Sequence, residues 1–134
     1  MAVYLDSNIL IFAFVNKDEK GERARALFDK IVRGQLDAMT SHLTFDEVFY
    51  QISQTSGREK AMSATQAALE IRHLRFLDAD GTVIRKAHEL LGKYNLSPRD
   101  AIHAASAILN GASSIITDDK DFEEVTEIKW EKLI

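Results

Sequence analysis

The apolar run Ala2-Val3-Tyr4-Leu5 stands near the start of the chain, and the carboxylate of Asp6 follows it directly. A second run, Ser114-Ile115-Ile116-Thr117, is followed in the same way by the acidic pair Asp118-Asp119. Short runs of this kind, rich in β-branched and aromatic residues, are typical of buried strands. If the two strands are parallel neighbours, both sets of carboxylates lie at one edge of a sheet, where open α/β folds place their functional sites.

The rest of the chain alternates between helical and extended patterns. The spacing of apolar residues predicts helices near residues 9–14, 24–32, 45–52, 61–69, 83–91 and 97–110. Strands are predicted at 3–5, 37–40, 74–77 and 114–117, with an edge strand within 128–134. This alternation predicts an α/β fold: a single domain over residues 1–134, with a mostly parallel central sheet covered by helices on both faces.

Composition excludes several classes of protein. The chain has 134 residues, 46% of them hydrophobic, which is enough for one domain with its own core. It has no cysteine, which excludes disulfides, zinc–thiolate sites and a cysteine nucleophile and fits a cytoplasmic location. No run approaches the roughly 18 apolar residues of a membrane helix, and Asp6 comes too early for a signal peptide, so we expect neither. The net charge of −4 is unlike that of a basic duplex-binding domain.

Two more acidic residues, Glu47 and Asp100, stand at the starts of predicted helices. Helices that begin at the same edge of the sheet would bring both carboxylates close to Asp6. Converging carboxylates repel one another unless a cation lies among them, and hard oxygen ligands suit Mg²⁺ or Mn²⁺. The leading hypothesis is therefore metal-dependent phosphoryl chemistry. The four histidines have no metal-ligand spacing to one another, but His103, one turn after Asp100, is a candidate to support the site.

Each acidic residue also has a structural explanation. Glu47 is placed to close a capping box with Thr44, and Asp100 is placed in the same way after Ser97. Asp6 is placed to cap the helix that follows the first strand, and the later acids are placed to serve a turn. Capping acids are needed on either edge of a sheet, however, whereas a site needs all of its acids at one edge. Three acids within residues 117–121 are also more than capping requires.

Four segments follow one another along the chain: Leu5-Asp6-Ser7-Asn8-Ile9-Leu10, Leu43-Thr44-Phe45-Asp46-Glu47-Val48, Ser97-Pro98-Arg99-Asp100-Ala101-Ile102-His103-Ala104-Ala105, and Ile116-Thr117-Asp118-Asp119-Lys120-Asp121-Phe122. In this order they resemble the opening Asp-(Thr/Ser)-Asn motif, the glutamate segment, the third-acid segment and the closing Thr-x-Asp element of the PIN domain family. The resemblance is greatest to the small VapC-type toxin ribonucleases. It covers nearly the whole chain, at family spacing.

The resemblance implies an acidic quartet of Asp6, Glu47, Asp100 and Asp119. The fourth acid of the family falls two residues after the threonine, which selects Asp119, with the adjacent Asp118 as the alternative. The implied ligands of Mg²⁺ or Mn²⁺ are Asp6, Asp100 and Asp119, with Asp118 and Asp121 as further candidates. Asn8 and Thr117 resemble the polar residues that orient the carboxylates.

On this resemblance the protein is a metal-dependent ribonuclease that hydrolyses RNA phosphodiester bonds, the toxin of a toxin–antitoxin pair. The implied partners are an RNA substrate, a VapB-like antitoxin and a second copy of the chain in a homodimer. Glu47 is implied to orient or deprotonate the attacking water. Basic side chains must contact the RNA phosphates, and the candidates are Arg99, Lys120, Arg58 and Lys60. Stacking on single-stranded bases by Phe12, Phe14 or Tyr50 competes with core packing as an explanation of these aromatic residues.

Two other interpretations stay open. A phosphatase of the haloacid dehalogenase type also begins with a strand that ends in aspartate. It needs a second aspartate two residues later, where this chain has Asn8. A catalytically silent PIN-like module that binds RNA or acts as a scaffold would share the fold, and metal binding without cleavage would indicate it.

Overall fold

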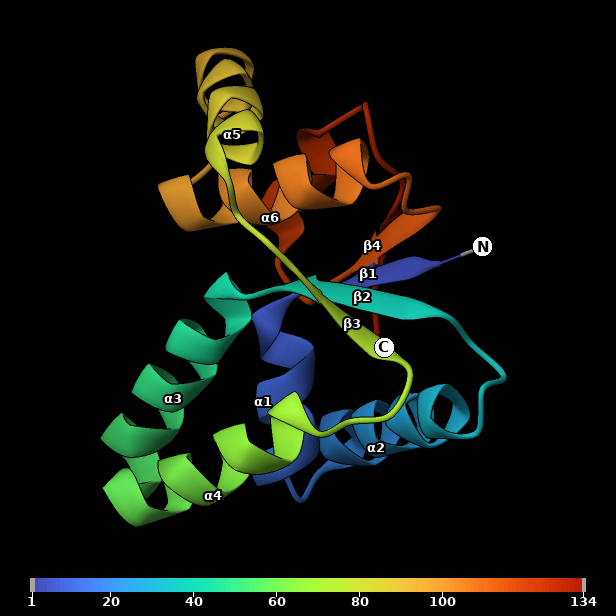
Figure 1. The fold of residues 1–134 in the computed structure, drawn as a ribbon, viewed down its shortest axis with the longest axis vertical. Coiled ribbons are helices and arrows are strands. Elements are labelled where there is room, and N and C mark those ends of the chain that lie inside the picture. The colour runs from blue at the N-terminus through green and yellow to red at the C-terminus, as the bar shows by residue number, and fades with distance from the viewer. Residues whose placement is uncertain (1, 134) are drawn as a thin grey trace.

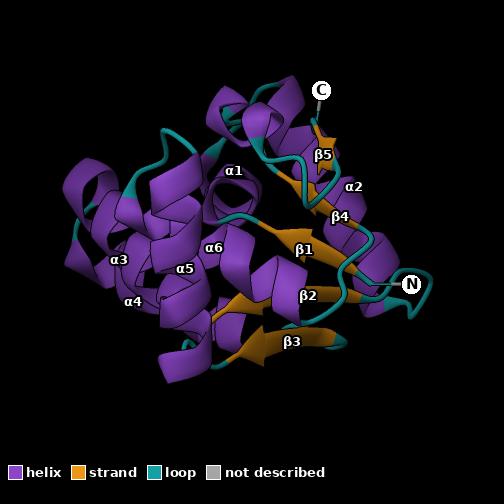
Figure 2. Ribbon diagram, turned by 90° about the horizontal axis from the view of Figure 1, so that it is seen from above, coloured by secondary structure: helices purple, strands orange, loops and turns teal. Residues whose placement is uncertain are grey.

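The computed structural model describes residues 2–133 and contains a five-stranded sheet whose strands are all parallel (Figure 1, Figure 2). The strands are β1 (Val3–Leu5), β2 (Ala38–Ser41), β3 (Leu74–Leu77), β4 (Ser114–Ile116) and β5 (Trp130–Glu131). Their order across the sheet is β3-β2-β1-β4-β5. The chain therefore builds outward from the central β1, first to one side and then to the other, and β1 and β4 pair at the point where the direction reverses.

Helices cover both faces of this sheet, as predicted (Figure 1). The helices are α1 (Ser7–Val15), α2 (Glu19–Val32), α3 (Leu43–Ser56), α4 (Arg58–Leu69), α5 (Gly81–Lys93) and α6 (Pro98–Leu109). Successive side chains of a strand point to opposite faces. Val3 and Leu5 accordingly pack in one core cluster with α1 to α4, whereas Tyr4 packs in a second cluster with α5 and α6.

Several predicted helix ends are confirmed by their capping geometry. Ser97 caps α6 by accepting a hydrogen bond from the Asp100 amide at 3.2 Å, and Pro98 occupies the first turn. Beyond the end of α2, Gly34 adopts a φ of 74°, in the left-handed region that glycine tolerates best.

The predicted capping box between Thr44 and Glu47 is wrong. Helix α3 already begins at Leu43, whose amide donates to the Ser41 hydroxyl at 3.0 Å. Thr44 is fully buried, and its hydroxyl shares a hydrogen bond of 2.6 Å with that of Thr40. Because Thr44 is used in the core, the side chain of Glu47 is free to leave the helix terminus and reach elsewhere.

The C-terminal segment contains an element that the sequence pattern did not predict. A short 3₁₀ helix, η1 (Lys120–Glu124), follows β4, and Asp119 caps it by accepting from the Asp121 amide. The predicted edge strand within 128–134 is present as the two residues of β5, and the last residue of that prediction, Ile134, lies outside the described residues. Among residues 2–133, no helix has the length and apolar character needed to cross a membrane.

Candidate metal centre

The candidate site begins where β1 and β4 end side by side. Leu5 pairs with Ile116, and the Asp6 amide donates to the Ile116 carbonyl at 3.1 Å, so the residues after both strands emerge together. Asp6 is only 4% exposed. One of its oxygens accepts from the Ser7 amide at 2.7 Å and caps α1, while the other accepts from the Thr117 hydroxyl at 2.7 Å. Asp6 is thus a helix cap and a member of the site at once.

Thr117 organises the residues around Asp6. Besides donating to Asp6, its hydroxyl oxygen accepts from the Asn8 side-chain amide at 3.2 Å and from the Asp119 backbone amide at 3.1 Å. The side-chain carbonyl oxygen of Asn8 is buried, and no described residue donates to it. A polar atom buried in this way next to carboxylates fits a site that receives a cation or its water.

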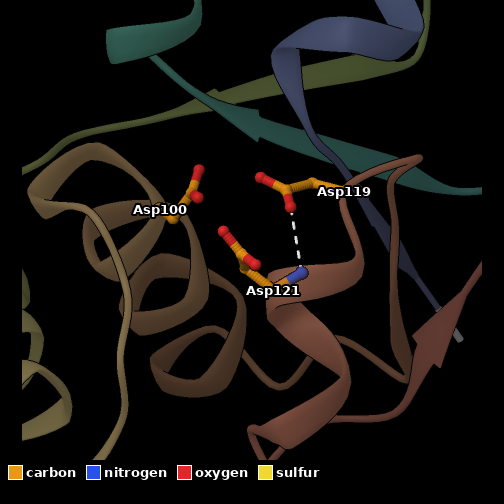
Figure 3. A group of neighbouring side chains, drawn as sticks. All are labelled: Asp100, Asp119 and Asp121. Carbon is orange, nitrogen blue, oxygen red and sulfur yellow. Dashed lines mark hydrogen bonds between the residues drawn. The ribbon is translucent and has the colours of Figure 1, made fainter.

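Three carboxylates lie close to one another in this part of the molecule (Figure 3). Asp100, from the first turn of α6, joins Asp119 and Asp121, with one oxygen of each within 4.8 Å of the others. The Asp121 amide donates to Asp119 Oδ1 at 2.9 Å and holds that side chain in place. We call these three residues the acidic trio. In the part of the chain that the structure describes, Asp6 and Glu47 lie outside this trio.

The electrostatics of the site oppose a full set of negative charges. Burial raises the pKa of Asp100 to about 7, and the nearby charges of Asp6 and Asp119 act in the same direction. Burial also raises the pKa of Asp6, partly offset by His103 and by the Thr117 hydrogen bond. His103 acts in the opposite direction on Asp100, and a bound cation would relieve the same repulsion.

Glu47 reaches the site from α3 and contacts a buried histidine. Its carboxylate oxygen Oε1 forms a hydrogen bond with Nε2 of His103, and its side chain is 14% exposed. The same Nε2 lies 3.6 Å from Asp6 Oδ1. Behind the ring, His103 Nδ1 is 2.6 Å from the hydroxyl of Tyr4. His103 therefore bridges Glu47 and Tyr4 and also lies beside Asp6.

The remaining predicted site residues lie at different distances from the acidic trio and make different contacts. Asp118 is not a member of the acidic trio and pairs instead with Lys20 of α2 at 2.5 Å. Arg99 and Lys120 are exposed beside trio members, and Arg99 lies 3.6 Å from Asp46. Arg58 and Lys60 begin α4, at the far end of the α3–α4 hairpin from Glu47 (Figure 1).

The aromatic candidates also differ from one another. Phe12 and Phe14 pack against the core cluster of α1 to α4, as the core interpretation predicted. Tyr50 is 55% exposed and belongs to no buried cluster among the described residues.

Sequence reasoning missed two residues of this region. Tyr4 was assigned only to the apolar first strand, although a hydroxyl within a buried strand needs a partner and so signals a polar contact nearby. Lys20 gave no such signal, because its partner Asp118 is 98 residues away in the chain.

Together, the fold and the site define an α/β protein that gathers carboxylates at the reversal point of a parallel sheet. Hard oxygen ligands in this arrangement suit a divalent cation of the Mg²⁺ or Mn²⁺ type. The chain belongs to the PIN domain family, whose model matches residues 3–128.

Known proteins that resemble this chain agree with that family. It is 23% identical to ribonuclease VapC6 of Methanocaldococcus jannaschii, over 95% of this chain and 94% of the relative. Its fold matches VapBC2 from Rickettsia felis bound to a DNA fragment from their promoter, with a TM-score of 0.79, 18% identity and 98% of both chains covered. It also matches VapC20 of Mycobacterium tuberculosis, a sarcin-ricin loop cleaving toxin, with a TM-score of 0.76, 18% identity and coverage of 92% and 95%.

Proposed function

We propose that this PIN-domain protein is a Mg²⁺- or Mn²⁺-dependent ribonuclease that hydrolyses RNA phosphodiester bonds, and that it is the toxin of a toxin–antitoxin pair. The observation that carries the proposal is the acidic trio, with Asp6 and Glu47 gathered at His103 on the same helix as Asp100. The names of the relatives, a ribonuclease and a toxin that cleaves the sarcin-ricin loop, support the same chemistry. The family match removes the basis for a phosphatase of the haloacid dehalogenase type, and Asn8 is bonded to Thr117.

The residues fit a divalent cation. Asp100, Asp119 and Asp121 would hold it, near enough to Asp6 for the charge of Asp6 to act on Asp100, and the buried Asn8 carbonyl oxygen is free to bind a coordinated water. When bound, the ion lowers the pKa of a coordinated water and offsets the negative charge that builds on the phosphate in the transition state. The raised pKa of Asp100 also supports a bound cation. Repulsion by Asp6 and Asp119 causes part of the rise, and a cation would remove this repulsion.

The fourth acid of the quartet is Asp119 in this proposal. Asp119 belongs to the acidic trio and is held by the Asp121 amide, whereas Asp118 is engaged with Lys20. Asp118 then neutralises a lysine at the rim of the site.

Glu47 is the residue proposed to receive a proton from the attacking water. Its Oε1 is bound to His103, while no described residue donates to Oε2. The second oxygen is therefore available to accept a hydrogen bond, and then a proton, from a water. Asp6 differs, because each of its oxygens already accepts one hydrogen bond from the protein.

In this proposal, basic side chains around the acidic trio contact the RNA. Arg99 and Lys120 each adjoin a member of the acidic trio in sequence, so they are proposed to contact phosphates next to the scissile bond. Arg58 and Lys60 lie at the other end of the α3–α4 hairpin, where they would reach only a more distant part of a long substrate.

A VapB-like antitoxin, a homodimeric state and a cytoplasmic location stay predictions of this proposal. The VapBC2 structure that the chain resembles is a toxin–antitoxin assembly bound to promoter DNA, and this supports an antitoxin partner. An antitoxin that covers the acidic trio would block cleavage.

The deciding experiment is cleavage of a labelled, mixed RNA pool in Mg²⁺ or Mn²⁺. Wild-type protein should cleave, and both EDTA and Asp6→Asn should abolish cleavage while the fold survives. Asp118→Asn is the matched control, because it also removes one carboxylate, but one that pairs with Lys20, whereas Asp6 is held by Thr117 beside His103. Cleavage that persists in Asp6→Asn would refute the carboxylate site. Metal binding without any cleavage would indicate the silent module instead.

A further inference from the structure

One buried titratable side chain next to the site has no role in the chemistry described so far. His103 lies one turn after Asp100 on α6 and is 0% exposed. Both ring nitrogens are engaged, Nδ1 with the Tyr4 hydroxyl at 2.6 Å and Nε2 with Glu47. A histidine that only fills space in a core needs no carboxylate partner from another helix.

The bonding pattern fixes which way the protons point. Burial, together with the charges of Asp6 and Glu47, raises the pKa of Tyr4 well above its usual value, so the phenol keeps its proton. A neutral His103 that accepts a hydrogen bond from the phenol at Nδ1 carries its single ring hydrogen on Nε2. A charged His103 also carries a hydrogen on Nε2. In both cases Nε2–H donates to Glu47, whose ionised carboxylate can only accept.

Glu47 needs such a donor because another carboxylate is close by. Asp6 Oδ1 lies 3.6 Å from the same Nε2, so two acids face one N–H group. Without this group, repulsion by Asp6 would turn the Glu47 carboxylate towards solvent. With it, Oε1 is anchored and the orientation of Oε2 is set.

We propose that His103 is a positioning residue that holds the Glu47 carboxylate beside Asp6, and that Tyr4 keeps the imidazole in the orientation this requires. The proposal rests on the proposed function, in which Glu47 accepts a proton from water. His103 touches neither substrate nor metal in this scheme and acts through Glu47.

Two substitutions separate positioning from packing. In His103→Gln the longer side chain places an amide near the position of Nε2, where it can donate to Glu47. In His103→Asn the shorter side chain places its amide near Nδ1, where it meets Tyr4 but cannot reach Glu47. His103→Asn leaves the larger cavity in the core, so a packing role predicts that the rate of each variant falls only as far as its thermal stability falls.

The first measurement is the single-turnover rate of RNA cleavage at saturating protein, alongside RNA affinity and thermal unfolding. We expect His103→Asn to lower the rate by about 10–100-fold, the usual effect of removing a residue that orients a ligand or base. RNA affinity should change little. His103→Gln should recover most of the rate. Equal rates in the two folded variants, or losses that follow only their unfolding temperatures, would overturn the proposal.

If both histidine variants fail to fold, Tyr4→Phe tests the same contact, because it leaves the imidazole of His103 unchanged. It removes only the hydroxyl that bonds Nδ1, and we expect a severalfold lower rate with unchanged RNA affinity. A wild-type rate in folded Tyr4→Phe would refute the role of Tyr4.

A second measurement does not depend on catalysis, so failure of the proposed function can be told from failure of this inference. Nitrogen-15 NMR of the wild-type protein, with His103 assigned by its loss in His103→Gln, reports which ring nitrogen carries hydrogen. We expect a protonated Nε2 whose shift changes in Glu47→Gln. An unprotonated Nε2, or an Nε2 shift that is the same in Glu47→Gln as in wild type, overturns the inference even if the wild-type protein cleaves RNA. The expected signal in a protein that cleaves nothing would leave the inference standing and the proposed function refuted.

Discussion

A carboxylate that is buried among other carboxylates favours its protonated form, and Asp100 shows this effect. Its pKa lies near 7, through burial first and the charges of Asp6 and Asp119 second. In the unfolded chain the same group has its ordinary pKa, near 3.8. The folded, metal-free protein therefore binds a proton between these two pH values that the unfolded chain has lost.

This difference makes the stability of the metal-free protein depend on pH. The contribution of Asp100 is fully present below the unfolded pKa and is lost as pH rises through the folded pKa. In EDTA, Asp100→Asn should therefore gain stability relative to wild type as the pH rises from about 5 to about 8. Thermal unfolding of both proteins across this range tests it. A difference that stays constant with pH would contradict the prediction, and Asp118→Asn, outside the acidic trio, should show no such rise.

Single residues also show where local sequence rules succeed and fail. For Asp6, capping and site membership were weighed as alternatives, yet its two oxygens perform both tasks. For Glu47, the capping box was wrong because Thr44 is used in the core by Thr40, a partner from the preceding strand. A local motif gives the choices open to a side chain, and tertiary contacts decide among them.

At the scale of elements, the helices and strands were predictable because each carries a clear apolar period and ordinary end signals. The pattern at 24–32 became α2, whose last residue is Val32, and the run at 74–77 became β3. The 3₁₀ helix η1 was missed, because its five residues span less than two turns and leave no period to detect.

The connection between α1 and α2 leaves no room for a side chain at Gly21. A Cβ on Gly21 would lie 2.0 Å from the backbone oxygen of Asn16, which Arg25 also contacts at 2.7 Å. Gly21→Ala should therefore lower the free energy of unfolding by about 1–3 kcal/mol or more, because the backbone at the joint must move. Urea unfolding measures this change.

Gly92 is the matched control for this prediction. It also lies within a helix, α5, but an added Cβ there would meet nothing within 4 Å. Gly92→Ala should stabilise the protein by about 0.5–1 kcal/mol, because alanine loses less backbone entropy in a helix. If Gly21→Ala were as stable as Gly92→Ala, the close approach of α1 and α2 would be refuted.

At the scale of the whole molecule, the site exists only because the sheet joins distant segments. The hydrogen bond from Thr117 to Asp6 spans 111 positions, and that between Glu47 and His103 spans 56. The parallel sheet could be predicted from the alternation of elements, and with it the edge to which the acids converge. The alternation of elements could not predict which of these acids lie in contact, because the choice between Asp118 and Asp119 depends on Lys20 and on the turn into η1.

That choice can be tested through the stability of the whole protein. An ion that binds only the folded state stabilises it by about 2.7 kcal/mol at a concentration of 100 times its Kd. Mn²⁺ should therefore raise the unfolding temperature of wild type, with no RNA present. Asp119→Asn should lose most of this rise, because it removes a charge from the acidic trio while an asparagine oxygen can still cap η1. Asp118→Asn should keep it. The reverse order of the two variants would assign the metal to Asp118 and would mean that Lys20 releases that carboxylate when the ion binds.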